Sequence, residues 1–172
     1  MSIIRAASEE DLSAILEIYN DAIVNTTSVY HYKPHTLEMR LEWFRDKMKG
    51  NFPVIVTEIG GRIAGFATFG PFRPWPAYKY TIEHSVYVHQ NFRRQGIASS
   101  LLKELIRLAE QHNVHAIVAG IDADNAGSIA LHQQLGFSEI GHFKEVGYKF
   151  GKWLDLKFLQ LILKTPLHPK EG

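Results

Sequence analysis

The sequence contains no cysteine, so disulfide bonds, thiol catalysis and cysteine-ligated metals are excluded, and a reducing compartment is favoured. No stretch approaches the roughly 18 consecutive apolar residues of a membrane-spanning helix, and residues 1–5 lack the apolar core of a signal peptide. An excess of one charge is also missing, because 19 basic and 18 acidic residues leave a net charge of +1. We therefore expect a cytoplasmic protein whose partner is a small molecule rather than nucleic acid or a membrane.

Several catalytic motifs are absent as well. No Gly-x-Ser-x-Gly motif supplies a nucleophilic serine. No HExxH-like pair and no acidic cluster accompanies the histidines that are candidate metal ligands, which are His84, His89, His112, His115 and His132. We therefore predict neither a metal site nor a covalent enzyme intermediate.

The length predicts one domain, residues 1–172, because 172 residues of which 45% are hydrophobic suit a single core. Apolar spacing predicts strands at residues 3–6, 54–59, 63–69, 81–88, 115–121, 138–148 and 153–163, with a tight turn at Gly60-Gly61. Helices are expected at residues 8–24, capped by Ser8 with Asp11, and at residues 36–48, 96–111 and 125–135. Residues 71–78 contain three prolines and should form a stiff loop without regular structure. This order is typical of an α/β fold, a mixed sheet with helices on both faces.

Residues 86–102 predict a strand that runs through a short glycine-containing loop into a helix. Gly96 and Ala98 keep side chains away, so backbone N–H groups can point at one anion where the helix dipole adds roughly half a positive charge. Arg93 and Arg94 supply further charge, and we interpret the loop as a diphosphate cradle. The alternative is a plain turn beside two solvated arginines. A nucleoside-triphosphate or dinucleotide site is disfavoured, because the loop lacks the lysine and the extra glycines that those sites need.

Two motifs, Arg93-x-x-Gly96-x-Ala98 and the segment 125–137, resemble the GNAT acyltransferase superfamily, whose element order is also the one predicted here. Residues 18–27, 80–88 and 147–155 resemble the phosphinothricin and methionine sulfoximine or sulfone acetyltransferases. The resemblance implies a GNAT fold with a mixed, mostly antiparallel central sheet, acetyl-CoA as co-substrate, and a homodimer. It also implies acetylation of the α-amine of a small amino acid or analogue, an activity linked to herbicide or antibiotic resistance.

The resemblance further implies which residues bind acetyl-CoA. Strand 86–88 would hydrogen-bond the pantetheine amides as a neighbouring strand does, and would hold the thioester beside the amine. Asn125 would hydrogen-bond the cofactor and Ser128 would cap its helix or contact the cofactor, with helix capping alone as the alternative for both. The expected cofactor-binding residues are Val86, Tyr87, Val88, Arg93, Arg94, Gln95, Gly96, Ile97, Ala98, Ser99, Asn125 and Ser128.

Two residues are candidates for catalysis. Glu83 matches the general base of this group, and the alternative is a structural pairing with Lys79 or a surface cation. Along strand 81–88 the side chains of Glu83 and His84 point to opposite faces unless a bulge breaks the alternation. His132 stands where many GNAT enzymes have a tyrosine, so it could donate a proton or a hydrogen bond near the CoA thiol. A packed structural histidine is the alternative.

Arg73 lies in the stiff loop, and a guanidinium can hold a carboxylate with two parallel hydrogen bonds. Aromatic residues beside it would wall the pocket or form a dimer contact; they are Phe72, Trp75 and Tyr78. Residues 25–29 are expected from the resemblance to close the pocket, from the same or the partner subunit. The expected substrate-binding residues are Arg73, Pro74, Trp75, Glu83, His84 and Ser85.

Two other functions stay open from the sequence. One is acetylation of a protein N-terminus or of another amine such as a polyamine, which would need an open groove in place of a deep arginine-anchored pocket. The other is a catalytically silent domain that binds acyl-CoA. For an active enzyme, direct transfer of the acetyl group to the amine is the expected mechanism.

Overall fold

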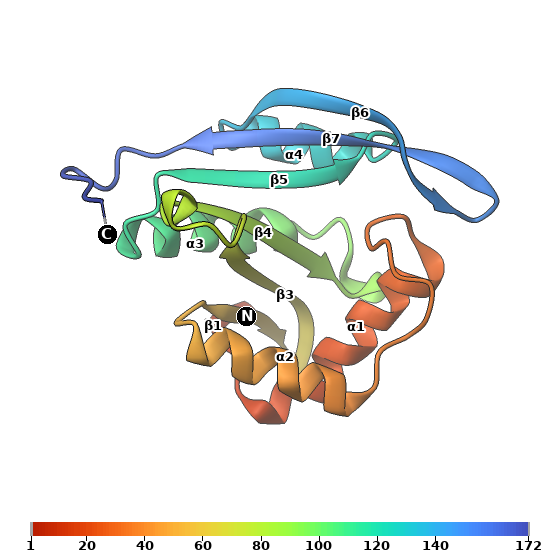
Figure 1. Cartoon of the computed structure of the whole chain (residues 1–172). Helices are drawn as coiled ribbons and strands as arrows, with labels where there is room; N and C mark the ends of the chain where they lie inside the picture. The colour runs from red at the N-terminus through yellow and green to blue at the C-terminus, as the bar shows by residue number, and fades with distance from the viewer. Residues whose placement is uncertain (1, 172) are drawn as a thin grey trace. The chain divides into compact units, whose positions relative to one another are not determined.

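The computed structural model describes residues 2–171. In chain order the strands and helices are β1 (Ser2–Ala6), α1 (Leu12–Asn25), α2 (Leu37–Lys49), β2 (Val54–Ile59), β3 (Arg62–Pro71), β4 (Thr81–Val88), α3 (Ile97–Gln111), β5 (Ala116–Asp122), α4 (Ala126–Gln134), β6 (Ser138–Lys149) and β7 (Lys152–Ile162). Short 3-10 turns lie at η1 (Glu9–Asp11), η2 (Pro76–Tyr78) and η3 (Gln90–Phe92). The strands form a mixed sheet in the order β1-β2-β3-β4-β5-β7-β6 (Figure 1), so the predicted α/β class is confirmed.

The chain divides into two compact units. The first unit comprises the residues up to Phe69 together with Ser85–Leu105, and the second comprises Gly70–His84 and the residues from Ile106 onward. Strand β4 and helix α3 each contribute residues to both units. None of the helices within residues 2–171 is long and apolar enough to cross a membrane.

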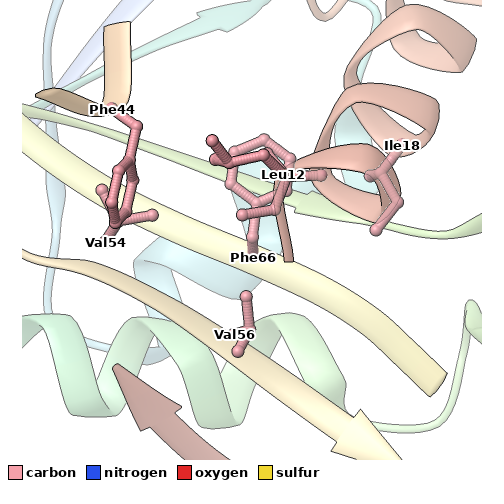
Figure 2. Packing of buried hydrophobic residues seen from close by; sticks show 7 residues of the cluster. Leu12, Ile18, Phe44, Val54, Val56 and Phe66 are labelled. Atoms are coloured by element: carbon pink, nitrogen blue, oxygen red, sulfur yellow. The ribbon is translucent and has the colours of Figure 1, made fainter. Parts of the chain in front are cut away.

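In the first unit, β1, β2 and β3 pair antiparallel. Gly60 and Gly61 form the predicted tight turn between β2 and β3, with φ angles of 57° and 75° that favour glycine. Helices α1 and α2 pack on β2 and β3 through a cluster of buried hydrophobic side chains (Figure 2). The buried members of this cluster are Leu12, Ile15, Ile18, Phe44, Val54, Val56 and Phe66.

The start of α1 differs from the prediction. Ser8 caps the 3-10 turn η1, and the α-helix itself begins only at Leu12. Asp11 explains this arrangement, because its Oδ2 accepts hydrogen bonds from the Ser8 backbone N–H at 2.8 Å and from Arg5 Nη1 at 2.8 Å. A buried carboxylate with these partners fixes the turn before the helix can start.

Helix α2 begins as predicted after Thr36, whose Oγ1 accepts a hydrogen bond from the Met39 N–H at 3.3 Å. Its buried face contains Phe44, as the apolar pattern suggests, and also a charged residue. Leu37 and Met48 are 50% and 46% exposed, whereas Arg40 is only 2% exposed. The Arg40 guanidinium lies over the rings of Tyr19 and Trp43, at 3.9 Å and 4.5 Å from their centroids. Apolar spacing therefore predicts the helix but not the burial of Arg40, which is stabilised because the aromatic rings accept a cation.

In the second unit, the first half of β4 pairs parallel with β5, and β5 pairs antiparallel with β7. Strands β6 and β7 form a long hairpin (Figure 1) that turns at Phe150-Gly151. A register shift interrupts β6 between Phe143 and Gly147, where Asp155 of β7 accepts a hydrogen bond from the Glu145 N–H at 2.9 Å.

The proline-rich segment is more regular than predicted. Strand β3 extends to Pro71, and Pro76–Tyr78 forms the 3-10 turn η2. Proline fits both places, because it can end a strand and its fixed φ suits the first turn of a helix. The other predicted elements match the structure to within one or two residues at each end.

Candidate active site

The loop before α3 belongs to the first unit and has the backbone form of an anion cradle. Arg94 and Gly96 both have left-handed φ angles, 61° and 76°. The Gly96 carbonyl then accepts the first helical hydrogen bond from the Ser100 N–H at 3.0 Å. Successive N–H groups in such a turn form a concave nest at the positive end of the helix dipole. A Cβ placed on Gly96 would meet no atom within 4 Å, so the space above the loop is open. These residues fit a bound diphosphate.

The two arginines of the loop differ in their surroundings. Arg93 Nη2 forms an ion pair with Asp21 Oδ2 of α1 at 3.0 Å, so part of its charge is already balanced. Arg94 is exposed, and Gln95 Nε2 donates to the Asn91 carbonyl at 3.5 Å. The backbone cradle is therefore the expected place for the anion, with Arg94 as its unpaired neighbouring charge within residues 2–171.

Gly65 of β3 supports the cradle, and sequence reasoning missed it. A Cβ at Gly65 would lie 2.8 Å from the Tyr87 carbonyl oxygen, 3.2 Å from Ile97 Cγ2 and 3.3 Å from Leu101 Cδ1. Only glycine therefore lets β4 and the start of α3 approach β3 this closely. An isolated glycine inside a predicted strand was the available signal.

Among the three β4 residues expected to hold pantetheine, Tyr87 turns its side chain into the core of the first unit. Its ring centroid lies 5.2 Å from that of Phe66 and 5.4 Å from that of Tyr19. Val86 and Val88 are half-buried, and contact between the backbone of this strand and pantetheine stays a prediction. In the first turn of α3, Ile97 is buried, and Ala98 and Ser99 are half-buried.

The second unit contains Glu83, which is half-buried on β4. Burial raises the pKa of its carboxyl group, and the positive charge of Arg73 opposes that change. No ion pair within 4.0 Å involves Glu83 in residues 2–171, and Lys79 Nζ instead lies 5.0 Å from the centroid of the Tyr80 ring. The carboxylate rests beside Gly120 of β5, where an added Cβ would lie 3.3 Å from Oε1. Glu83 is therefore a partly desolvated base without a counter-ion in contact.

Arg73 is exposed on the loop that precedes β4. Its Nη1 donates to the Phe72 carbonyl at 2.8 Å, and the guanidinium lies 4.2 Å from the centroid of the Phe72 ring. Tyr78 packs against both Phe72 and Trp75, with centroid distances of 5.7 Å and 6.2 Å. The aromatic residues thus stiffen the loop and leave most of the five Arg73 donors available. Pro74 is exposed on the same loop, and Ser85 is half-buried on β4.

His132 on α4 is bonded at both ring nitrogens. Its Nδ1–H donates to the Ser128 carbonyl oxygen at 2.7 Å, and its Nε2 lies 3.0 Å from His84 Nε2. Because a neutral imidazole carries one proton, His132 Nε2 accepts and His84 Nε2–H donates. His84 Nδ1 is then a buried acceptor without a hydrogen-bond partner among residues 2–171. Burial lowers the pKa of both rings, so the pair is neutral, and this geometry favours the packed alternative for His132.

Asn125 is the N-cap of α4, because its Oδ1 accepts a hydrogen bond from the Ser128 N–H at 3.1 Å. The expected capping is therefore present, while cofactor contact by either residue stays a prediction. Within residues 2–171 no three His, Asp or Glu side chains converge to hold a metal ion.

In the first unit, the nest of N–H groups before α3 suits a ligand that carries a diphosphate. In the second unit, Glu83 is a partly buried carboxylate without an ion-pair partner in residues 2–171, as is typical of a catalytic base. The family described as "Acetyltransferase (GNAT) family" matches residues 13–137, so the chain belongs to this family. It is an acetyl-CoA-dependent N-acetyltransferase, and the GNAT fold expected from the sequence is confirmed.

The relatives agree over nearly the whole chain. The L-methionine sulfoximine/L-methionine sulfone acetyltransferase of Pseudomonas aeruginosa is 43% identical, covering 93% of this chain and 94% of the relative. A phosphinothricin N-acetyltransferase of Streptomyces viridochromogenes is 33% identical, with 97% and 91% covered. Among solved structures, yncA from Salmonella typhimurium with its cofactor acetyl-CoA has a TM-score of 0.95 at 40% identity, with 99% and 98% covered. A ribosomal-protein-alanine N-acetyltransferase from Brucella melitensis has a TM-score of 0.92 at 48% identity, with 94% and 99% covered.

Proposed function

We propose that the enzyme acetylates the α-amine of a small amino acid or analogue such as methionine sulfone, methionine sulfoximine or phosphinothricin. The observation that carries this proposal is the Glu83 carboxylate, half-buried, without an ion-pair partner in residues 2–171, and influenced by the charge of Arg73. A base in the electrostatic field of a guanidinium suits an acceptor that has both an amine and a carboxylate. The names and high coverage of the bacterial relatives support the same substrate class.

The reaction proceeds by direct transfer within a ternary complex. The amine nitrogen forms a bond to the acetyl carbonyl carbon, the carbon–sulfur bond breaks, and CoA leaves as a thiolate. The proton lost from the amine passes to Glu83, directly or through water. In this scheme the N–H nest at Gly96 holds the diphosphate, and the β4 backbone at Val86 and Val88 holds the pantetheine amides.

Glu83 needs to supply only modest assistance. The α-amine of a peptide has a pKa of about 8 and is roughly one-tenth neutral at pH 7, and each pKa unit corresponds to about 1.4 kcal/mol. The carboxylate of a free amino acid raises the pKa of its amine further, so Glu83 has somewhat more to supply for such an acceptor. The leaving thiol has a pKa of about 8.5, so its thiolate is a tolerable leaving group without protonation. We therefore assign His132 no proton transfer: it positions His84 of β4 against α4 through their hydrogen bond.

The direct test is a thiol-release assay with acetyl-CoA and a panel of amino acids. Methionine sulfone, methionine sulfoximine and phosphinothricin should release CoA, and mass spectrometry should find the acetyl group on the α-nitrogen. The N-acetylated acceptors serve as controls and should release none. Absence of release with every free amino acid would contradict the proposal.

A second candidate is acetylation of a protein N-terminus, favoured by the similarity to the Brucella melitensis enzyme. The two candidates differ in the group on the carboxyl side of the amine. A free amino acid presents a carboxylate to Arg73, whereas a peptide presents a neutral amide. Comparing alanine with a peptide that begins with alanine therefore separates them: faster acetylation of the peptide would favour the second candidate.

We also propose that two copies assemble through the β6–β7 hairpin. Large apolar side chains are more than half exposed along this hairpin, namely Ile140, Phe143, Phe150, Trp153 and Ile162. Exposed apolar groups gathered on one element mark an interaction surface, and identical copies pair most often by a two-fold axis. Light scattering should give twice the chain mass of 19.6 kDa. Trp153→Glu should yield monomer, whereas Leu167→Glu, at an exposed residue of the C-terminal tail, should not.

A further inference from the structure

Strand β5 is buried at every residue except one. Residues 116–119, 121 and 122 are buried, but Gly120 is exposed. The exposure is local, because Gly120 pairs with Phe158 of β7 in a regular antiparallel register. Gly120 is therefore exposed because it has no side chain, and this leaves a small open space in the middle of a buried strand.

Three side chains surround this open point. A Cβ built on Gly120 would lie 3.3 Å from Glu83 Oε1, 3.5 Å from Phe158 Cε1 and 3.8 Å from Leu156 Cδ1. The first distance is too short for ordinary contact, so any side chain would force the carboxylate to move. The other two are ordinary van der Waals contacts. The Glu83 carboxylate therefore lies in space that a side chain at residue 120 would partly occupy.

The backbone does not explain the glycine. Gly120 has no left-handed φ, so other residues could adopt its conformation without strain. Gly65 separates strands and a helix that approach closely, but the Gly120 neighbours are side chains rather than backbone. The glycine at residue 120 is therefore explained by the space that it leaves beside the side chains of Glu83, Leu156 and Phe158.

We propose that Gly120 is a positioning and specificity-determining residue for acetyl transfer. By lacking a side chain it seats the Glu83 carboxylate, and it leaves open an apolar floor between Leu156 and Phe158 for the part of the acceptor next to the amine. The inference rests on the proposed function. It assigns an acceptor whose amine reaches Glu83 while its methylene groups cover Gly120.

The test compares Gly120→Ala with Gly141→Ala in the full-length protein. Gly141 pairs with the same residue, Phe158, from the β6 side, and a Cβ there would meet nothing within 4 Å. Displacement of a reacting group by a fraction of its contact distance lowers rates strongly, so Gly120→Ala should reduce kcat about tenfold to a hundredfold. The acid limb of its pH–rate profile should move to higher pH, because a methyl group that displaces water disfavours the charged carboxylate. Gly141→Ala should match the wild type in both.

Acceptor size gives the second readout. KM in Gly120→Ala should rise more for methionine sulfone than for alanine, because the longer side chain needs the floor. Leu156→Ala enlarges the same space and should shift the preference toward longer acceptors, which keeps the inference testable should Gly120→Ala not fold. Unchanged kcat, pH profile and acceptor preference in a folded Gly120→Ala variant would overturn the inference.

A double-mutant cycle separates this inference from the proposed function. If Gly120 acts through Glu83, Gly120→Ala should lower kcat in the wild type but not further in Glu83→Gln. Equal losses in both backgrounds would overturn the positioning role of Gly120 while Glu83 keeps its role as base. A wild-type rate in Glu83→Gln alone would instead remove the base from the proposed function.

Discussion

His84 and His132 are joined by a hydrogen bond between their Nε2 atoms, which lie 3.0 Å apart, and their rings stack with centroids 5.0 Å apart. The bond links β4 to α4 within the second unit, directly beside Phe137. The Ser128 carbonyl fixes the tautomer of His132, and this in turn fixes the proton of His84. Protonation of either ring puts a charge in a buried place, and a second proton between the Nε2 atoms would break the bond.

The His84–His132 pair should make stability depend on pH. Burial lowers both native pKa values, whereas the unfolded chain has histidine pKa values of about 6.5, so below that pH the unfolded state binds more protons. The contribution of the pair to the free energy of unfolding should therefore be largest above about pH 6.5. It should fall as the pH decreases toward the native pKa values of the two histidines. Urea denaturation measured at several pH values between about 5 and 8 tests this.

The matched variants are His84→Thr combined with His132→Leu, and His168→Gln. The first removes both buried imidazoles and should flatten the pH dependence, whatever it does to stability at neutral pH. His168 is exposed on the C-terminal tail, so its replacement should keep the wild-type slope. An equally steep slope in the double variant would assign the pH dependence to other groups.

The cradle at Gly96 predicts a specific loss of acetyl-CoA binding. Acetyl-CoA should raise the melting temperature of the wild type, because a ligand that binds only the native state stabilises it. Gly96→Glu should abolish the shift, since it puts a carboxylate where the diphosphate belongs and strains a φ of 76°. Gly61→Glu carries the same two changes at a turn with φ of 75° and should keep the shift. A shift that survives in Gly96→Glu would remove the assignment of this loop.

The extent of sequence-based prediction depends on how local each feature is. The Gly60-Gly61 turn, the bounds of β4 and the strand–loop–helix around Gly96 depend on neighbouring residues, and all three agree with the structure. The Arg93–Asp21 ion pair joins residues 72 apart, and the His84–His132 bond joins residues 48 apart. No periodicity in a single sequence encodes which polar groups meet over such separations.

The two glycines missed from the sequence illustrate the same limit. Gly65 and Gly120 both lie inside strands, where a glycine can signal a bulge or a close approach. The neighbour that an added side chain would crowd comes from a different element in each case: the Tyr87 backbone for Gly65 and the Glu83 carboxylate for Gly120. The burial of Arg40 against Tyr19 and Trp43 could not be predicted for a related reason, because a charged residue interrupts the apolar pattern that predicts a core.

Glu83→Gln should lower kcat at pH 7 by roughly a hundredfold, the low end of the range for a general base. The deficit should shrink as the pH rises, because the acceptor amine then loses its proton without help. Burial raises the pKa of the wild-type carboxyl group, so activity should be lost on the acid side at a higher pH than an ordinary glutamate would give. Acetyl-CoA affinity, measured by calorimetry, should stay unchanged. A wild-type rate at pH 7 would leave Glu83 without a catalytic role.

Arg73→Ala should raise KM for an amino acid far more than for its methyl ester. The guanidinium uses one donor on the Phe72 carbonyl, and the rest can hold a carboxylate in two parallel hydrogen bonds. A hydrogen bond to a charged group contributes about 1.5–3 kcal/mol, which corresponds to at least a tenfold change in KM. Arg73→Lys should recover only part of the loss, because an ammonium cannot form the paired contact. Equal losses for acid and ester would place the anchor at another residue, and a methyl ester that outperforms the acid in the wild type would turn the substrate assignment toward peptide N-termini.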